Sequence, residues 1–287
     1  MHNANNFPSV TISSNTLFHF TSDIDRIRSI LEEGFRPNLS LEDLSCLGLQ
    51  QKVAIPMVSF CDIPLSQTKA HMQYYGHYGI GLSKSWGREK GINPVLYTYQ
   101  GSPLAVSLSQ SLAWTYAKYL GIRKLDPFIP HEAWARIASI FRGIKKDATR
   151  SKQYLKLWDK LLRLQCFIKP YEGLSYKTNP PFQNVRFYDE REWRFVPELR
   201  EDLYKYLLYE EEYNNEPACK KATNEIHARS KLSFESTDIK YIIIHHDEEI
   251  VSMIEKIQDI KPTRYSTDEI KVLSSKLISA QQIATDL

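Results

Sequence analysis

Apolar and polar residues alternate in short runs along the first hundred residues, which predicts strands separated by short helices. The run at 16–20 alternates residue by residue, and it places His19 on the face opposite to Phe18, near the end of the strand. Ser22 then opens an S-x-x-D capping box, and an apolar stripe with helical spacing continues to Gly34. The first unit is therefore predicted to be a strand, a helix and a glycine exit.

The next apolar runs predict further strands. The run at 53–65 is buried in character and is expected to be interrupted at Pro56, and 78–87 is expected to be the next strand. Alternation places Gly79 and Gly81 on one face of it. Such a face either admits a ligand or another backbone, or marks a crowded position in the sheet, and the pattern leaves both open.

The character changes to helix from residue 104 to about 168, where large apolar residues recur at helical spacing. Residues 136–163 hold nine Lys and Arg against two Asp, whereas 189–216 hold ten acidic residues against four basic ones. This asymmetry predicts a basic helical face and an acidic region, although two solvated faces of opposite charge would give the same count. Strands resume at 184–198.

Taken together, these elements predict an α+β protein in which residues 1–287 form a single domain with a helical insertion at about 104–168. The composition, 42% hydrophobic and 25% charged, is that of a soluble globular protein, and a net charge of +3 does not by itself imply a nucleic-acid partner. The four cysteines form no CxxC pattern, which is typical of a reducing cytoplasm. No signal peptide and no membrane span are expected.

The stretch NVRFYDEREWRFVPE combines a strand pattern with an unusual row of charge. Alternation places Glu190, Glu192 and Arg194 on one face and Trp193 and Phe195 on the other. The aromatic face is expected to meet a core. The charged face then lies either in water, as an ordinary salt-bridged strand, or in a cleft.

Familiar catalytic motifs do not resolve this choice. The sequence has no P-loop, and its histidine pairs lack the spacing of a zinc site, so no metal is expected. A carboxylate in a cleft can bind a ribose hydroxyl and stabilise an oxocarbenium-like centre. An imidazole can orient such a substrate by a hydrogen bond, and a tyrosine ring can stack on a planar leaving group. His19, Ser59, Tyr78 and Glu192 are the candidates for this chemistry.

The segments LFHFTSDIDRIRSILEEGFRPN and AIPMVSFCDIPLSQTKAHMQYYGHYGIGLSKSWG resemble the AbiGi family of abortive phage infection proteins. The likeness extends through residues 17–99, and the later EREWRF resembles a segment of the same family. That family carries the label of an antitoxin. The resemblance therefore implies a role in anti-phage defence and a cognate toxin or antitoxin protein as partner, with little chemistry attached.

A more distant resemblance is to ADP-ribosyltransferases of the DarT type, which begin with a similar strand and helix and end with a glutamate on a late strand. It implies a split mixed or antiparallel sheet with flanking helices, NAD as co-substrate, and an H-Y-E set of residues. His19 and Thr21 would hold the nicotinamide ribose and amide, and Arg36 the phosphates. Glu192 and His19 would be the catalytic residues. Ser59 would also contact NAD, and Glu190 would complete an E-x-E pair that contacts the target. No clear S-T-S segment is present. Tyr78, or else Tyr75, would stack on the nicotinamide and so help to bind NAD, although the choice stays open among Tyr74, Tyr75 and Tyr78.

The basic segment suggests which target such an enzyme would modify. Arg142, Lys145, Lys146 and Arg150 are expected to bind phosphate groups, which makes RNA or DNA the predicted acceptor. The leading hypothesis is then an anti-phage toxin that transfers ADP-ribose from NAD to a nucleic acid. The alternative is a non-catalytic antitoxin, or interaction module, that binds a partner toxin.

Overall fold

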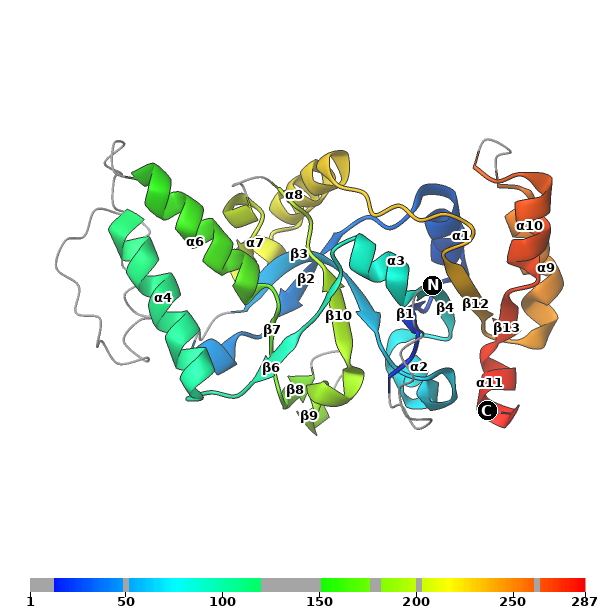
Figure 1. The fold of residues 1–287 in the computed structure, drawn as a ribbon, viewed down its shortest axis with the longest axis horizontal. Coiled ribbons are helices and arrows are strands. Elements are labelled where there is room, and N and C mark those ends of the chain that lie inside the picture. Colours follow the sequence, from blue (N-terminus) through cyan, green and yellow to red (C-terminus); the bar gives the residue numbers. More distant parts are fainter. Residues whose placement is uncertain are drawn as a thin grey trace, which may run out of the picture.

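A computed structural model describes residues 13–48, 52–119, 151–175, 182–199, 203–260 and 264–286. Its centre is a nine-stranded sheet of order β13-β12-β4-β1-β3-β10-β5, with β2 and β11 also paired to β3 (Figure 1). The central strands are β1 (Thr16–Thr21), β3 (Val53–Cys61), β4 (Tyr78–Ser83), β10 (Glu192–Phe195) and β12 (Ile239–Ile244). The remaining ones are β2 (Asn38–Glu42), β5 (Asn93–Pro94), β11 (Leu208–Tyr209) and β13 (Leu277–Ser279).

All of these neighbours run antiparallel except β12 and β13, which are parallel. The prediction of an α+β protein with a mixed sheet and flanking helices is therefore confirmed. The ADP-ribosyltransferase-like form of that sheet stays a prediction, as does the single domain with its insertion.

The alternation of β1 sorts its side chains between two separate cores. Leu17 packs into one cluster, and Phe18 and Phe20 pack into another. A Cβ on Gly81 would lie 2.8 Å from Cε1 of Phe18, and one on Gly79 would lie 2.9 Å from Cδ1 of Phe20. The glycine face of β4 is thus a crowded sheet position that makes room for two aromatic rings, and not an approach for a ligand.

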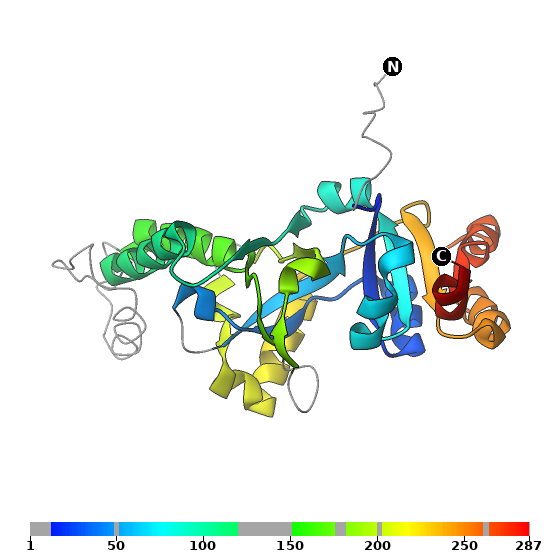
Figure 2. The same cartoon turned by 90° about the horizontal axis from the view of Figure 1, so that it is seen from below.

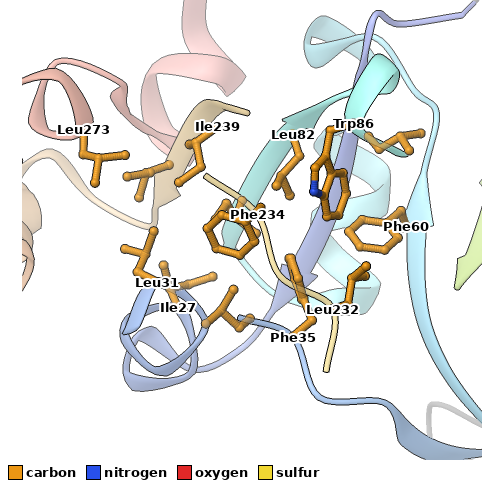
Figure 3. Packing of buried hydrophobic residues seen from close by; sticks show 14 of the residues in the cluster. Ile27, Leu31, Phe35, Phe60, Leu82, Trp86, Leu232, Phe234, Ile239 and Leu273 are labelled. Carbon is orange, nitrogen blue, oxygen red and sulfur yellow. The ribbon is translucent and has the colours of Figure 1, made fainter. Parts of the chain in front are cut away.

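The larger core joins the sheet to several helices through aromatic rings (Figure 3). Phe35 contacts three other rings of this core, with its ring centroid 5.2 Å from that of Phe60, 5.6 Å from Phe234 and 6.3 Å from Trp86. The helices of this core are α1 (Ile24–Glu33), α3 (Lys84–Glu89), α9 (Ile250–Gln258) and α10 (Thr267–Ser274). The second core lies between β1 and the helices α2 (Lys69–Tyr75) and α11 (Ala280–Asp286).

Two further helices lie at one end of the molecule, and α9 and α10 lie at the opposite end (Figures 1 and 2). They are α4 (Pro103–Tyr119) and α6 (Ser151–Gln165). In the sequence they come between β6 (Leu96–Thr98) and β7 (Ile168–Pro170), which pair as parallel strands. The rings of Tyr116 and Trp158 pack between them with centroids 4.8 Å apart. Helix was predicted here from the spacing of large apolar residues, and the described residues bear this out.

Several local predictions were wrong in instructive ways. The N-cap of α1 is Asp23, whose side chain accepts the N–H of Asp25, so Ser22 lies outside the helix. Pro56 does not interrupt β3, because the strand continues through it opposite Leu39. The strand expected at 78–87 ends at Ser83, where that serine caps α3.

The stretch 184–198 is not one strand. It holds the end of β9 (Phe182–Val185), a short 3-10 helix η4 (Phe187–Glu190) and β10. The hairpin of β8 (Gly173–Ser175) and β9 precedes this turn. The acidic region that follows folds as α7 (Glu210–Asn214) and α8 (Glu216–Arg229).

Candidate functional site

A cleft of about 810 Å³ opens over β3, between α1 and β2 on one side and the segment from β7 to β10 on the other. Six of the residues predicted for the site line it: His19, Arg36, Ser59, Tyr75, Glu190 and Glu192. The geometric condition for the predicted constellation is thus met, because the imidazole of His19 and the carboxylate of Glu192 border the same cleft. Their individual roles stay predictions.

His19 reaches the cleft from β1, and its ring packs against two aromatic rings. Its ring lies 5.2 Å from Phe35 and 5.9 Å from Phe60, measured between centroids. Nδ1 lies 2.9 Å from the carbonyl oxygen of Ser59, which can only accept, so Nδ1 carries the proton. Burial lowers the pKa of His19. At neutral pH the ring is therefore uncharged, and Nε2 is a hydrogen-bond acceptor.

Glu192 occupies the first position of β10, opposite Cys61, and both of its carboxylate oxygens are fully engaged. Oε1 accepts from Ser59 Oγ at 2.8 Å and from Arg194 Nε at 2.6 Å. Oε2 accepts from Lys169 Nζ at 2.7 Å and from Arg194 Nη2 at 3.1 Å. Burial alone would raise the pKa of Glu192, but the charges of Arg194 and Lys169 hold it well below its usual range.

Arg194 carries this network into the interior. Its side chain is 0% exposed, and it also donates to the carbonyl oxygen of Cys166 at 2.8 Å and to the carboxylate of Glu42. Burial opposes its charge, but Glu192 and Glu42 raise the pKa of the guanidinium. The charged row was expected to face water or a cleft. Glu192 does border the cleft, but Glu192 and Arg194 are also the more buried half of β10, and Trp193 and Phe195 are the partly exposed half.

Glu190 arrives at the same point by a route that strand alternation does not describe. It ends the short helix η4, and Arg191 then turns the chain with a positive φ of 45°. Glu190 accepts from the hydroxyl of Tyr75 at 2.6 Å, and its other oxygen pairs with Lys169. Burial, followed by the charge of Glu190, raises the pKa of Tyr75 well above its ordinary value.

Lys169 is a residue of this cluster that was not predicted from the sequence. It lies on β7 between Ile168 and Pro170, and its ammonium group also lies 5.1 Å from the ring centroid of Phe187. Burial would lower its pKa, but Glu192 and Glu190 raise it above the ordinary lysine value. A single lysine in a short apolar run gives no signal of its own. Only the ion pairs with Glu190 and Glu192 show that Lys169 belongs to the site.

Two predicted NAD contacts lie away from the cleft. Thr21 ends β1 opposite Tyr78 of β4, and its Oγ1 accepts the N–H of Asp23 at the start of α1. The hydroxyl of Tyr78 donates to Glu249 at 2.7 Å. In the sheet, β4 is separated from β10 by β1 and β3, so Tyr78 lies about 14 Å from the strand of Glu192. Of the three tyrosines left open by the sequence, the cleft has only Tyr75 in its lining.

The rim of the cleft carries mixed charge. Its described lining holds seven carboxylates and four Lys or Arg side chains. Arg36, expected at the NAD phosphates, pairs with Glu33 at 2.8 Å, and both side chains are substantially exposed. Among the described residues, no group of three or more His, Cys, Asp and Glu is arranged to hold a metal ion. Arg142, Lys145, Lys146 and Arg150 lie outside the described residues.

Comparison with known proteins identifies the family. A family model described as "Putative abortive phage resistance protein AbiGi, antitoxin" matches residues 34–245. The chain belongs to the AbiGi family. It is similar to the abortive phage resistance protein AbiGi of Lactococcus lactis subsp. cremoris, with 27% identity over 248 residues that cover 81% of this chain and 88% of that protein. No solved structure matches the chain.

The AbiGi match bears directly on the site. It spans Ser59, Lys169 and Glu192 together with Arg194, whereas it begins after β1 and so leaves His19 outside the matched segment. Within the part of the chain that the structure describes, no helix is long and apolar enough to cross a membrane.

Proposed function

We propose that this AbiGi-family chain is the antitoxin of an abortive phage infection system, in which it binds a partner toxin protein and restrains it. The family description supports this directly, because it names an antitoxin among phage resistance proteins. The cleft around Glu192 then contributes to the shape of the binding module and performs no reaction.

The observation that carries this proposal is the state of the Glu192 carboxylate. Ser59, Lys169 and Arg194 donate four hydrogen bonds to its two oxygens, and the side chain is 8% exposed. A carboxylate that has to stabilise a developing positive charge needs a lone pair directed at the substrate. Here those directions are taken by two cations of the protein, Lys169 and Arg194, and by the hydroxyl of Ser59. The arrangement supports a structural role, in which Glu192 joins β3, β7 and β10.

Growth on expression distinguishes the two classes of function. An antitoxin expressed alone is expected to leave bacterial growth unchanged. The chain, immobilised as bait, should capture a protein from a lysate of its native host, and that protein expressed alone should arrest growth. Co-expression with the chain should restore growth. Growth arrest by the chain alone, with no rescue of any captured protein, would contradict the antitoxin function.

A second candidate function is transfer of ADP-ribose from NAD to a macromolecule. What favours it is that His19 and Glu192 border one cleft and are linked through Ser59, whose carbonyl binds the imidazole and whose hydroxyl binds the carboxylate. The cleft volume of about 810 Å³ suits a dinucleotide-sized ligand. In this case Glu192 would stabilise the ribose carbon as nicotinamide leaves, and Lys169 would have to move away from it.

Labelled NAD tests this candidate. The chain would be incubated with NAD and cell lysate, beside Glu192→Gln and Lys169→Met. Both variants break the ion pair between Lys169 and Glu192, but only the first removes the carboxylate. A catalytic Glu192 predicts that nicotinamide release is lost in Glu192→Gln and kept in Lys169→Met, with both shown to be folded by thermal unfolding. Absence of release and of label transfer from the unmodified chain would exclude the reaction. The nucleic-acid acceptor stays a prediction.

A further inference from the structure

One face of α6 is left exposed after the helix has packed against the rest of the molecule. Tyr154 and Trp158 contact α4, and Leu162 is buried. On the side away from these contacts, Leu157 is 43% and Leu164 58% exposed. They are seven positions apart in the sequence, so they lie along one side of the helix, about two turns apart.

Lysines accompany these leucines. Lys156 and Lys160 are exposed, one helical turn apart, and they lie on the same side of α6 as Leu157 and Leu164. Arg163 instead turns inward, where it donates to the carbonyl oxygens of Val196 and Pro197. The exposed surface formed by Lys156, Leu157, Lys160 and Leu164 is called the α6 face below. It is apolar along its line and positively charged at its edge.

A surface of the opposite charge lies on α9. Val251 is 66% exposed, and Glu255 and Asp259 follow it at intervals of four residues on the solvent side of the helix. Lys256, on the same helix, pairs with Asp25 at 2.7 Å. The surface formed by Val251, Glu255 and Asp259 is called the α9 face below. It has an exposed apolar side chain in line with two carboxylates.

The helices that carry these two faces, α6 and α9, lie at opposite ends of the longest dimension of the molecule (Figures 1 and 2). One copy therefore cannot bring its own α6 face to its own α9 face, whereas two copies can. We propose that copies of this chain associate head to tail, with the α6 face of one copy bound to the α9 face of the next. Leu157 and Leu164 would cover Val251, and the lysines would meet Glu255 and Asp259.

The chemistry favours a second copy over another occupant because each face supplies what the other lacks. Opposite charges on the rims of a contact steer association and fix its register, while the apolar side chains are removed from water. A contact between two different patches is heterologous, so it leaves one α6 face and one α9 face open at the ends of every assembly. The mean size of the assemblies should therefore increase with protein concentration. This inference does not depend on the proposed antitoxin function.

Sedimentation velocity of the unmodified chain over a roughly hundredfold concentration range tests the association. The expected result is a mean mass that rises with concentration beyond a dimer. In 1 M salt the Debye length is about 3 Å, so exposed charges farther apart than this are largely screened. The apparent dissociation constant should therefore rise at least tenfold. A chain that stays monomeric at every concentration, or one that stops at a dimer, would overturn the proposal.

Mixing two blocked variants tests the head-to-tail arrangement itself. Lys160→Glu with Leu164→Glu disables the α6 face, and Val251→Lys with Glu255→Lys disables the α9 face. Each double variant alone is expected to be monomeric. Their equimolar mixture should form dimers and nothing larger, because one intact face of each kind remains. Lys220→Glu, on the exposed side of α8, is the charge control and should associate like the unmodified chain. A mixture that stays monomeric would refute the arrangement.

Discussion

Glu190 and Glu192 bind the same ammonium group, that of Lys169, although they do not belong to one strand. Arg191 between them has a φ of 45°, the only positive φ of a non-glycine residue in the described ranges. In a continuous strand, alternation would place residues 190 and 192 on the same face. Here the turn at Arg191 places them on the same side, and it brings two carboxylates to one cation. Arg194 also pairs with Glu192 and supplies a second positive charge to this cluster.

Glu192→Gln should lower the free energy of unfolding at pH 7 by about 3–5 kcal/mol, the usual effect of removing one partner of a buried ion pair. Arg194, which is 0% exposed, would keep its charge and lose its principal counter-ion. Chemical denaturation measures the change. Glu190→Gln is the matched control, with a smaller expected loss, because the side chain of Glu190 is 18% exposed against 8% for Glu192. A loss below about 1 kcal/mol for Glu192→Gln would contradict the structural role.

Arg191→Gly and Arg191→Val should differ in stability by about 1–3 kcal/mol, with the glycine variant the more stable. Glycine adopts a φ of 45° without strain, whereas a β-branched residue does not. Both variants remove the same weak ion pair, in which Arg191 Nη2 lies 4.0 Å from the carboxylate of Asp62, so its effect cancels in the comparison. Urea denaturation of the two variants gives the difference. Equal stabilities would mean that the turn is not imposed on this residue.

Local patterns predicted the elements that depend on local physics. The strand at 16–20 and its two faces follow from alternation, and Gly34 ends α1 because a φ of 84° suits glycine. The predicted burial of Trp193 and Phe195 holds only partly, since both pack against the large core but are only partly buried. Alternation identified which residues share a face. It could not tell which face is the buried one, because the decision rests on ion pairs with Lys169 and Glu42, which are distant in sequence.

The remaining parts of the site were beyond the sequence for a related reason. Tyr78 and Tyr75 are three residues apart, but β4 carries Tyr78 to the far side of β1 while α2 turns Tyr75 into the cleft. That difference depends on the order of strands in the sheet, which no local pattern specifies. The same holds for Ser59, whose link between His19 and Glu192 exists only because β3 lies between β1 and β10.

Acidification should destabilise the fold through His19. Burial lowers the pKa of His19 from 6.5, so the unfolded chain binds the proton more readily than the folded one. The stability is therefore complete above pH 6.5 and falls as the pH decreases below it, by at most about 1.4 kcal/mol per pH unit for one group. Denaturation between about pH 7.5 and pH 5.5 measures the slope, with those limits set about one unit on either side of 6.5.

His19→Phe is the control for this pH dependence. The ring keeps its contacts with Phe35 and Phe60, so the variant should fold and show a smaller slope over the same window. Burial also lowers the pKa of His227 and of His245, and these two groups should supply the slope that remains in the variant. An unchanged slope in His19→Phe would show that His19 is not the group responsible.

Gly76→Ala should be more damaging than Gly81→Ala, although both glycines are tightly enclosed. A Cβ on Gly76 would lie 2.3 Å from backbone atoms of Thr21 and Ser22, and its φ of 106° is itself unfavourable for alanine. The nearest atoms to a Cβ on Gly81 belong to the side chains of Phe18 and Thr16, at 2.8 Å, and a side chain can shift where backbone cannot. Overpacking at Gly81 is expected to cost about 1–3 kcal/mol, and Gly76→Ala should exceed that range.

Because Gly76 caps the helix that carries Tyr75, its substitution should also reach the cleft. Displacing the end of α2 would pull the Tyr75 hydroxyl from Glu190, a hydrogen bond of 2.6 Å, whereas Gly81→Ala should leave that bond in place. Thermal unfolding ranks the two variants, and crystal structures would show the Tyr75–Glu190 distance in each. If Gly81→Ala proved the more destabilising of the two, the rings of Phe18 and Phe20 would be fixed more rigidly than the backbone turn between α2 and β4.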